Sequence, residues 1–374
     1  FLMPVNIMLK DNADDIREKV KAVYKKHPVI EQIQEEAKDL TKRYVSRVIS
    51  EPKKITLTEL SEMADAVFIA LHGRPGEDGT LQRELEKFNL PYNGSGPDSS
   101  SITINKYETN TLLEKHGILV AKRKLVTKAE WVNEKERLLS SLENALGYPM
   151  IAKPADDGCS SAVKKIKNAA ELKAYIKLMF AEDALQGSES ADILKIRANE
   201  EFPQKDFFLA EELVSAKGAK HFLEITGGIL TRYDDKGELQ YEIFEPSEAL
   251  ATGDILSLEE KFLAGEGQNI TPARFAVSKK AADYKAIAAE VKATLEKTSR
   301  ILNVQGYARI DAFVRVFDNN KVETIVIEVN SLPGMTPATC IFHQTAINGY
   351  RPYDFIDNIL SFGIARQKQT HLQA

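Results

Sequence analysis

The sequence predicts a mixed α/β (α+β) protein built from several domains. Its 374 residues exceed the roughly 100–200 that one domain usually contains. Apolar residues make up 43% and charged residues 28%, which is the balance of a soluble globular protein. Segments with helical spacing of apolar residues alternate with short apolar or alternating segments that are typical of strands. These observations favour two or three domains in which helices cover sheets.

Charge and cysteine content argue against several protein classes. The net charge of −5 argues against general nucleic-acid binding, which usually needs a clustered basic surface. The longest purely apolar run, residues 66–71, is far shorter than the roughly 20 residues of a bilayer span. Cys159 and Cys340 provide no disulfide framework and fit a reducing compartment. We therefore expect a cytoplasmic protein without membrane or nucleic-acid partners, and the start at Phe1 predicts an excerpt or a processed chain.

The first region, residues 1–97, is expected to be an N-terminal α/β domain whose completeness the sequence leaves open. Its helical segments are indicated by two apolar series: Ile16, Val20 and Val23, and then Ile30, Ile33, Ala37, Leu40 and Tyr44. The apolar segment 67–71 predicts a buried strand that ends in the turn-rich segment 72–79. A cluster of Gly, Pro, Ser and Asn at 91–97 marks the domain boundary.

The second region, residues 98–200, is expected to be a central domain. Its predicted elements are a helix over 129–146, a strand over 148–153, a glycine-containing loop over 155–161, a helix over 169–180 and an exposed linker over 186–200. The lysine at the end of the apolar strand, Lys153, is notable because the flanking residues read as buried.

The third region, residues 201–374, is expected to be a C-terminal domain. Its predicted elements are a strand over 207–214, a long loop over 253–273, a helix over 282–302 and strands over 307–314 and 324–330. Long loops inside compact domains are often functional lids. The last two strands are joined by Asp318-Asn319-Asn320-Lys321, and a two-residue turn at 319–320 would pair residue 318 with 321.

Counting outward from that turn predicts a polar face on the hairpin. Asp311 then lies opposite Glu328, and Arg309 lies opposite Asn330, all on one face because strand side chains alternate. Opposed carboxylates repel one another unless positive charge lies between them. Oxygen ligands of this kind suit Mg²⁺ beside phosphate groups, and Arg309 is placed to hold a phosphoryl oxygen. A solvated surface hairpin is the alternative reading of the same pattern.

A family resemblance adds to this reading. The segment Glu328-Val329-Asn330-Ser331-Leu332-Pro333-Gly334-Met335-Thr336 resembles the metal and substrate loop of D-alanine–D-alanine ligases, which are ATP-grasp enzymes. Residues 307–311 resemble the strand before that loop, and residues 71–79 and 91–96 resemble the N-terminal signature of the family. The match keeps its order from about residue 66 to 349, roughly three quarters of the chain.

The resemblance implies an ATP-grasp architecture with nucleotide bound between the central and C-terminal domains. It implies a ligase that uses ATP and Mg²⁺, with Mn²⁺ as a substitute, to join two D-alanines through an acyl phosphate for peptidoglycan. The implied ATP-binding residues are Lys106, Lys153, Cys159, Ser160, Glu211, Leu213, Val214 and Lys261. The implied substrate residues are His72 and Glu77 for the first substrate, and Phe262, Gly334 and Thr339 for the second. Arg309 and Lys261 are the implied catalytic residues, Asp311, Glu328 and Asn330 the metal ligands, and a homodimer is the implied assembly.

Departures from the family pattern keep other functions open. Phe262 stands where these ligases carry tyrosine, which suggests a D-alanine–D-lactate ligase. Cys159 stands where serine is usual, His221 stands near the ribose-binding glutamate, and residues 1–65 lack the usual first-substrate loop. The missing loop and Cys159 favour an ATP-binding paralogue without ligase activity, whereas the intact Asp311, Glu328, Asn330, Lys106 and Lys153 oppose it. A different ATP-grasp enzyme is disfavoured by the signature in segment 72–79.

Overall fold

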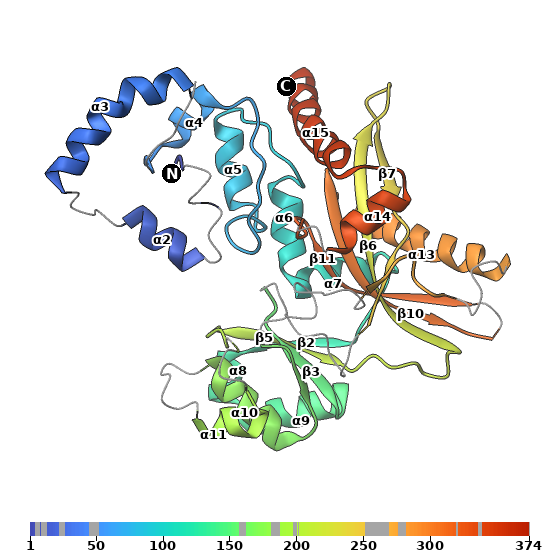
Figure 1. Ribbon diagram of the computed structural model, residues 1–374. Coiled ribbons are helices and arrows are strands. Elements are labelled where there is room, and N and C mark those ends of the chain that lie inside the picture. Colours follow the sequence, from blue (N-terminus) through green and yellow to red (C-terminus); the bar gives the residue numbers. More distant parts are fainter. Residues whose placement is uncertain are drawn as a thin grey trace. The chain divides into compact units, whose positions relative to one another are not determined.

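The computed structural model describes residues 1–3, 8, 13–21, 27–44, 52–156, 162–180, 188–196, 200, 202–250, 269–275, 282–318, 321–335 and 339–373. Contacts between residues divide the chain into two units, residues 1–65 and residues 66–374 (Figure 1). The second unit holds both sheets of the molecule and every described residue that the sequence singled out for a site.

The described part of the first unit is helical, which confirms the helical prediction for this region. It contains α2 (Ala13–Lys21), α3 (Pro28–Tyr44) and α4 (Leu57–Met63). Helix α4 begins with a capping box, in which Thr56 accepts from the Glu59 backbone N–H and the Glu59 carboxylate accepts from the Thr56 N–H. Leu2 and Lys53 exchange backbone hydrogen bonds and bring the two ends of the unit together.

A four-stranded antiparallel sheet forms one half of the second unit in the described residues. Its order is β2 (Arg123–Thr127), β5 (Phe207–Glu212), β3 (Met150–Lys153) and β4 (Lys164–Ile166). The helices α8 (Lys128–Asn133), α9 (Lys135–Leu146), α10 (Ala169–Phe180) and α11 (Ser188–Leu194) belong to this half. Their apolar faces bury a core with the sheet, because Leu142 of α9 and Tyr175 of α10 pack in one cluster with Phe208 of β5.

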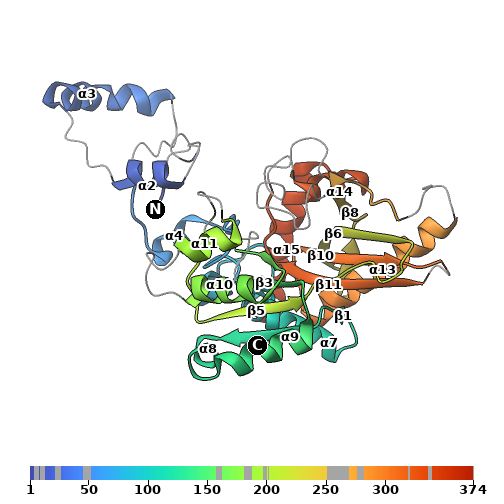
Figure 2. The same ribbon diagram turned by 90° about the horizontal axis from the view of Figure 1, so that it is seen from below.

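The described residues also form a seven-stranded sheet. Its order is β1 (Leu119–Val120), β11 (Val322–Asn330), β10 (Tyr307–Val316), β6 (His221–Tyr233), β8 (Ser247–Ala249) and β9 (Asn269–Ile270), with β7 (Leu239–Ile243) paired to β6. One face packs on α13 (Ala282–Ile301), whose Val291 and Leu295 share a core with Ile225 and Ile310. The other face carries α14 (Cys340–Ile347) and α15 (Pro352–Gln373) (Figure 2). On this face, Phe355 of α15 meets Tyr307 of β10 edge to face.

In the second unit, three short helices precede β1 in the described residues. They are α5 (Thr80–Lys87), α6 (Pro97–Ile104) and α7 (Lys106–Lys115). Asn105 caps α7, because its side-chain oxygen accepts from the backbone N–H groups of Tyr107 and Glu108. This cap fixes Lys106 as the first residue of the helix.

Several expected elements are corrected by the structure. The predicted strand 67–71 is an extended segment with a single bridge from Val67 to Tyr92, since the buried Asn93 side chain takes both backbone bonds of Ile69. The predicted helix 129–146 is broken at Glu134, which ends α8 and precedes α9. The expected linker 186–200 contains α11. Strand β9 lies in the expected loop 253–273, of which residues 253–268 lie outside the described part.

The hairpin register is confirmed at the polar end and wrong at the turn. Phe317, rather than Asp318, pairs with Lys321 through a backbone bond of 3.0 Å, so the connection is one residue longer than predicted. A β-bulge between Asp311 and Ala312 makes Ile327 an extra residue of β11 and shifts the register back. Arg309 therefore does lie opposite Asn330, and Asp311 opposite Glu328.

The loop 91–96 is clamped by α15. The Arg366 guanidinium lies 4.3 Å from the centre of the Tyr92 ring and donates to the carbonyl oxygens of Gly94 and Tyr92, at 2.7 and 3.2 Å. Helix and loop approach so closely that a Cβ atom on Gly363 would lie 2.3 Å from the Tyr92 carbonyl oxygen. Glycine is thus required at this helical position by close packing.

We expect Gly363→Ala to lower the free energy of unfolding by about 1–3 kcal/mol, because the added methyl overlaps backbone atoms. The sign is opposite to that of an open helical position, where alanine is favoured over glycine by about 1 kcal/mol. Urea unfolding measures the difference, and Ser361→Ala on the exposed face of the same helix should stay within about 0.5 kcal/mol of wild type. A more stable Gly363→Ala protein would contradict the prediction.

Candidate active site

The hairpin places four functional side chains on one face of the seven-stranded sheet. Arg309 and Asp311 alternate along β10, and their partners Asn330 and Glu328 alternate along β11. On the other side of β10, Arg309 faces Gly228 of β6. A Cβ atom at Gly228 would lie 2.4 Å from the Gln344 side-chain oxygen, so the glycine allows α14 to approach the sheet beside the site.

Arg309 neutralises one of the opposed carboxylates. Its Nε lies 3.1 Å from Asp311 Oδ1 and its second terminal nitrogen lies 3.2 Å from Oδ2, which is a bidentate pair. Asp311 is buried, at 4% exposed, and the Arg309 side chain is 15% exposed. Burial by itself would lower the pKa of the Arg309 guanidinium, but Asp311 and Glu328 outweigh it and raise that pKa, so Arg309 stays charged.

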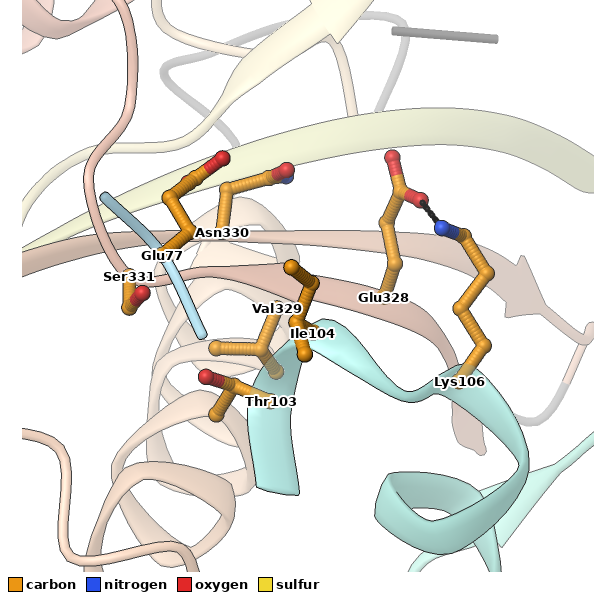
Figure 3. A pocket seen from close by; sticks show the side chains of 8 residues that line it. All are labelled: Glu77, Thr103, Ile104, Lys106, Glu328, Val329, Asn330 and Ser331. Carbon is orange, nitrogen blue, oxygen red and sulfur yellow. Dashed lines mark ion pairs between the residues drawn. The ribbon is translucent and has the colours of Figure 1, made fainter. Parts of the chain in front are cut away.

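Lys106 neutralises the other carboxylate. Its Nζ lies 3.3 Å from Glu328 Oε2, and the two side chains are 10% and 15% exposed (Figure 3). The backbone N–H of Lys106 donates to the Ala155 carbonyl at 2.7 Å, which ties the start of α7 to the segment after β3. Positive charge does lie beside both carboxylates, as the repulsion between them requires, and lysine and arginine supply it.

A second buried ion pair joins two strands of the four-stranded sheet. Lys153 at the end of β3 places its Nζ 2.6 Å from Glu211 Oε2 on β5. The Glu211 Oε1 atom is buried and has no hydrogen-bond partner among the described residues, which leaves an acceptor for a ligand. Leu213 and Val214 follow β5 directly and are half-buried.

Glu77 connects the turn-rich segment 72–79 to the loop after β11. Its carboxylate accepts from the backbone N–H groups of Gly73 at 2.6 Å and Leu332 at 3.2 Å. Burial raises the pKa of this carboxyl above its usual 4.5, against the lowering by both N–H groups, His72 and Arg309. His72 itself is exposed at the start of the segment.

A pocket within the second unit brings Glu77, Lys106, Glu328 and Asn330 together. It is lined by Glu77, Thr103, Ile104, Lys106, Glu328, Val329, Asn330 and Ser331, and its free space, including the part open to solvent, is about 310 Å³ (Figure 3). Asn330 Nδ2 and Ser331 Oγ are buried donors without a partner in the described residues. Such donors fit an anionic ligand with oxygen acceptors, as phosphates or a carboxylate provide.

The remaining predicted residues fall in two groups. Gly334 is buried in the loop after β11, and Thr339 is the residue before α14. Cys159, Ser160, Lys261 and Phe262 lie outside the described residues. The structure therefore brings together Arg309, Asp311, Glu328, Asn330, Lys106 and Glu77, and it pairs Lys153 with Glu211.

The structure adds polar residues that the sequence interpretation missed. Ser247, Thr226, Asp311 and Glu328 are successive partners in one row across β8, β6, β10 and β11. Gln344 of α14 donates to the Thr226 carbonyl at 2.7 Å and to Ser247 Oγ at 2.9 Å. The available signal was weak, because the row of polar residues exists only after the strands pair.

The described residues contain no group of three or more His, Cys, Asp or Glu side chains suited to a metal ion. A divalent ion would therefore depend on Asp311, Glu328 and the Asn330 amide together with oxygen atoms of a ligand, a donor set of hard oxygens that fits Mg²⁺. In the same part of the chain, no helix combines the length and the apolar character that crossing a bilayer requires.

We expect the raised pKa of Glu77 to appear in the pH dependence of stability. The folded state favours the protonated acid, so its stabilising contribution is present below the usual value of 4.5 and is lost as pH rises through the raised pKa. The free energy of unfolding of wild type minus that of Glu77→Gln should therefore fall across this interval. Urea unfolding at several pH values measures it, with Glu84→Gln on α5, whose side chain is 43% exposed, as the control for losing one charge. A difference that rises with pH would refute the assignment.

Comparison with known proteins identifies similar sequences over most of the chain. A sequence model described as D-ala D-ala ligase C-terminus matches residues 112–186 and 189–361, and one described as D-ala D-ala ligase N-terminus matches residues 11–95. The D-alanine–D-alanine ligase of Leptospira interrogans serovar Lai is 31% identical over 304 residues, which are 81% of this chain and 74% of that protein. The ligase of Geobacter sulfurreducens is 29% identical over 305 residues, 80% of this chain and 77% of that protein.

Solved structures show the same fold. The D-alanine–D-alanine ligase of Coxiella burnetii matches with a TM-score of 0.59 at 20% identity, over 83% of this chain and 72% of that one. The ligase of Bacillus anthracis, solved in complex with ATP, matches with a TM-score of 0.56 at 24% identity, over 84% of both chains. The predicted mixed α/β architecture is therefore confirmed.

Proposed function

The chain belongs to the D-alanine–D-alanine ligase family, and we propose that it joins two D-alanines in an ATP-dependent reaction that supplies D-alanyl-D-alanine for peptidoglycan. The family assignment confirms the resemblance found in the sequence. The observation that carries the proposal for this chain is the polar face of the β10–β11 hairpin, where two opposed carboxylates lie with Arg309 and Lys106 beside a pocket. The relative solved with ATP supports the choice of nucleotide.

We assign the nucleotide to Lys106, Lys153 and the end of strand β5. Lys106 and Lys153 are the cations for its phosphates, and the partnerless Glu211 Oε1 is an acceptor for an adenine amino group. Leu213 and Val214 follow Glu211 and would contact the adenine. Cys159, Ser160 and Lys261 complete the proposed nucleotide set on the family resemblance alone. We propose that the nucleotide lies between the two predicted domains, residues 98–200 and 201–374, with β5 on the side of the first because it pairs with β2 and β3.

The hairpin is assigned to the metal ion and the transferred phosphoryl group. Asp311, Glu328 and Asn330 would hold Mg²⁺, or Mn²⁺ in its place, which neutralises phosphate charge when bound. Arg309 is rigid, permanently charged and held in plane by Asp311, so its remaining N–H groups can orient a phosphoryl oxygen near the reacting carboxylate. Arg309 thereby stabilises negative charge that develops as the acyl phosphate forms and breaks.

The substrates are assigned to the loops around the pocket. His72 and Glu77 would hold the first D-alanine, and the buried Glu77 carboxyl borders the pocket directly. Gly334 and Thr339 would bind the carboxylate of the second substrate through the backbone and a hydroxyl, and Phe262 would cover it. Holding both substrates in line with the phosphate gives the reaction its proximity advantage. A cytoplasmic location and a homodimer stay predictions.

Product analysis of the purified chain tests the ligase proposal. With ATP, Mg²⁺ and D-alanine, we expect equimolar ADP, phosphate and D-alanyl-D-alanine, detected by phosphate release and mass spectrometry. A parallel reaction with D-alanine and D-lactate separates the dipeptide ligase from the D-alanine–D-lactate alternative. Nucleotide binding without phosphate release in either reaction would favour the inactive paralogue instead.

We expect Asp311→Asn and Glu328→Gln each to lower kcat by about 100-fold or more, because each removes a charged ligand where phosphate charge must be neutralised. Phosphate release at saturating ATP and increasing Mg²⁺ measures the loss. Glu323→Gln is the matched control, since Glu323 lies on the same strand but pairs with Arg315 and Lys321 at the other end of the hairpin. Equal losses in all three variants would point to a folding defect and contradict the assignment.

A further inference from the structure

Each carboxylate assigned to the metal ion is already held by a cation of the chain. Arg309 holds Asp311 through two nitrogens at 3.1 and 3.2 Å, and Lys106 lies 3.3 Å from Glu328. Two negative and two positive side chains thus balance on this face of the hairpin, and the Glu77 carboxyl lines the same pocket. A free divalent cation arriving here would meet two ligand carboxylates that are both already paired with cations of the chain.

We propose that Lys106 guards the metal site: it suppresses binding of free divalent cations and transfers to the phosphates when the metal arrives with nucleotide. The proposal rests on the proposed function, because it takes this face as the site of the metal–nucleotide complex. It adds an order to that function, in which metal and ATP bind together rather than one after the other. Lys106 acts as a positioning residue for Glu328 in the unloaded protein and as a phosphate ligand in the loaded one.

The two ion pairs differ in a way that singles out Lys106. Arg309 grips Asp311 with a planar, bidentate fork, which fixes both side chains in one geometry. Lys106 is a point charge on a flexible stem, and its contact with Glu328 Oε2 is longer than an ideal charged hydrogen bond. The Lys106–Glu328 pair is therefore the one that can exchange partners while the Arg309–Asp311 pair stays in place.

The position of Lys106 on α7 points the same way. It is the first residue of this ten-residue helix, and the positive end of a helix disfavours a cation and favours an anion. Glu328 supplies that anion in the unloaded protein. The buried donors Asn330 Nδ2 and Ser331 Oγ lack acceptors in the described part of the pocket, so phosphate oxygens entering beside Lys106 would satisfy them as well.

The charges explain why metal and nucleotide would bind together. A divalent ion alone would be repelled by Lys106 and Arg309 in a partly buried site, where such interactions are screened less than in water. Phosphate groups bring the negative charge that accepts Lys106 and leaves Glu328 to the metal. The coupling is reciprocal, so bound metal must raise nucleotide affinity by the same factor.

Binding of Mn²⁺ to the full chain, followed by electron paramagnetic resonance, tests the proposal without any turnover. In the absence of nucleotide, we expect Lys106→Met to bind Mn²⁺ at least about tenfold more tightly than wild type, or about 1.4 kcal/mol. Lys164→Met is the matched control, because it removes a poorly exposed lysine whose carboxylate partner, Glu200, has no role in the proposed site. The control should bind Mn²⁺ as wild type does. With a non-hydrolysable ATP analogue, wild type should gain more Mn²⁺ affinity than Lys106→Met.

Equal Mn²⁺ affinity in wild type and Lys106→Met, or an equal gain in Lys164→Met, would overturn the proposed role of Lys106. Lys106→Arg keeps the charge and should bind Mn²⁺ like wild type. This variant tests the proposed role of Lys106 even if Lys106→Met does not fold. A Lys106→Arg protein that binds free Mn²⁺ tenfold more tightly would also overturn it. Failure of the ligase function looks different: Mn²⁺ would bind with the analogue while no dipeptide forms. Absence of Mn²⁺ binding in every condition would refute both the proposed role of Lys106 and the assignment of the metal ligands.

Discussion

Two carboxylates, Asp311 and Glu328, face each other across neighbouring strands on a largely buried surface, and the local structure is arranged around the repulsion between them. Side chains at paired positions of an antiparallel ladder cannot move apart without breaking the ladder. Cations must come to them, and they do so from two places: Arg309 from the same strand, and Lys106 from the first turn of α7. Removing either cation would leave a carboxylate uncompensated in a poorly hydrated site, which is costly in free energy.

The surrounding elements hold this pair of strands and the loop that follows them. Helix α13 covers the opposite face of the sheet with Val291 and Leu295, so the hairpin is anchored by a core that excludes the polar face. Gln344 of α14 bonds to the backbone and to a side chain of the neighbouring strands. On the pocket side, Glu77 accepts from the Leu332 N–H, which ties the turn-rich segment to the loop after β11. The packing of α15 on the loop 91–96 steadies the segment in which Asn93 bonds to Ile69.

The two lysine–glutamate pairs of the proposed site have the same arrangement of charge. Lys153–Glu211 and Lys106–Glu328 are both poorly exposed, and each joins a lysine assigned to phosphate to a carboxylate assigned to another part of the same ligand complex. A polyanion with its metal ion can replace both contacts at once, giving each lysine a phosphate and each carboxylate a new partner. Such exchange keeps buried charges paired before and after binding, and so avoids the cost of leaving a buried ion unpaired.

The sequence by itself determined the family resemblance and the four polar side chains that share one face of the hairpin. Alternation along two strands and the order of short motifs were sufficient to place Arg309, Asp311, Glu328 and Asn330 on one face, because strand periodicity is a local property. Their pairing was predicted correctly although the connection is one residue longer than the predicted turn, since a bulge at Ile327 compensates. Only the tertiary structure decided that Lys106 and Arg309 neutralise the two carboxylates, that Thr226 and Ser247 extend the polar row, and that Asn93 replaces an expected strand pairing. Apart from the Arg309–Asp311 pair, these contacts join residues far apart in the chain, and their geometry follows from packing and charge balance rather than from any local pattern.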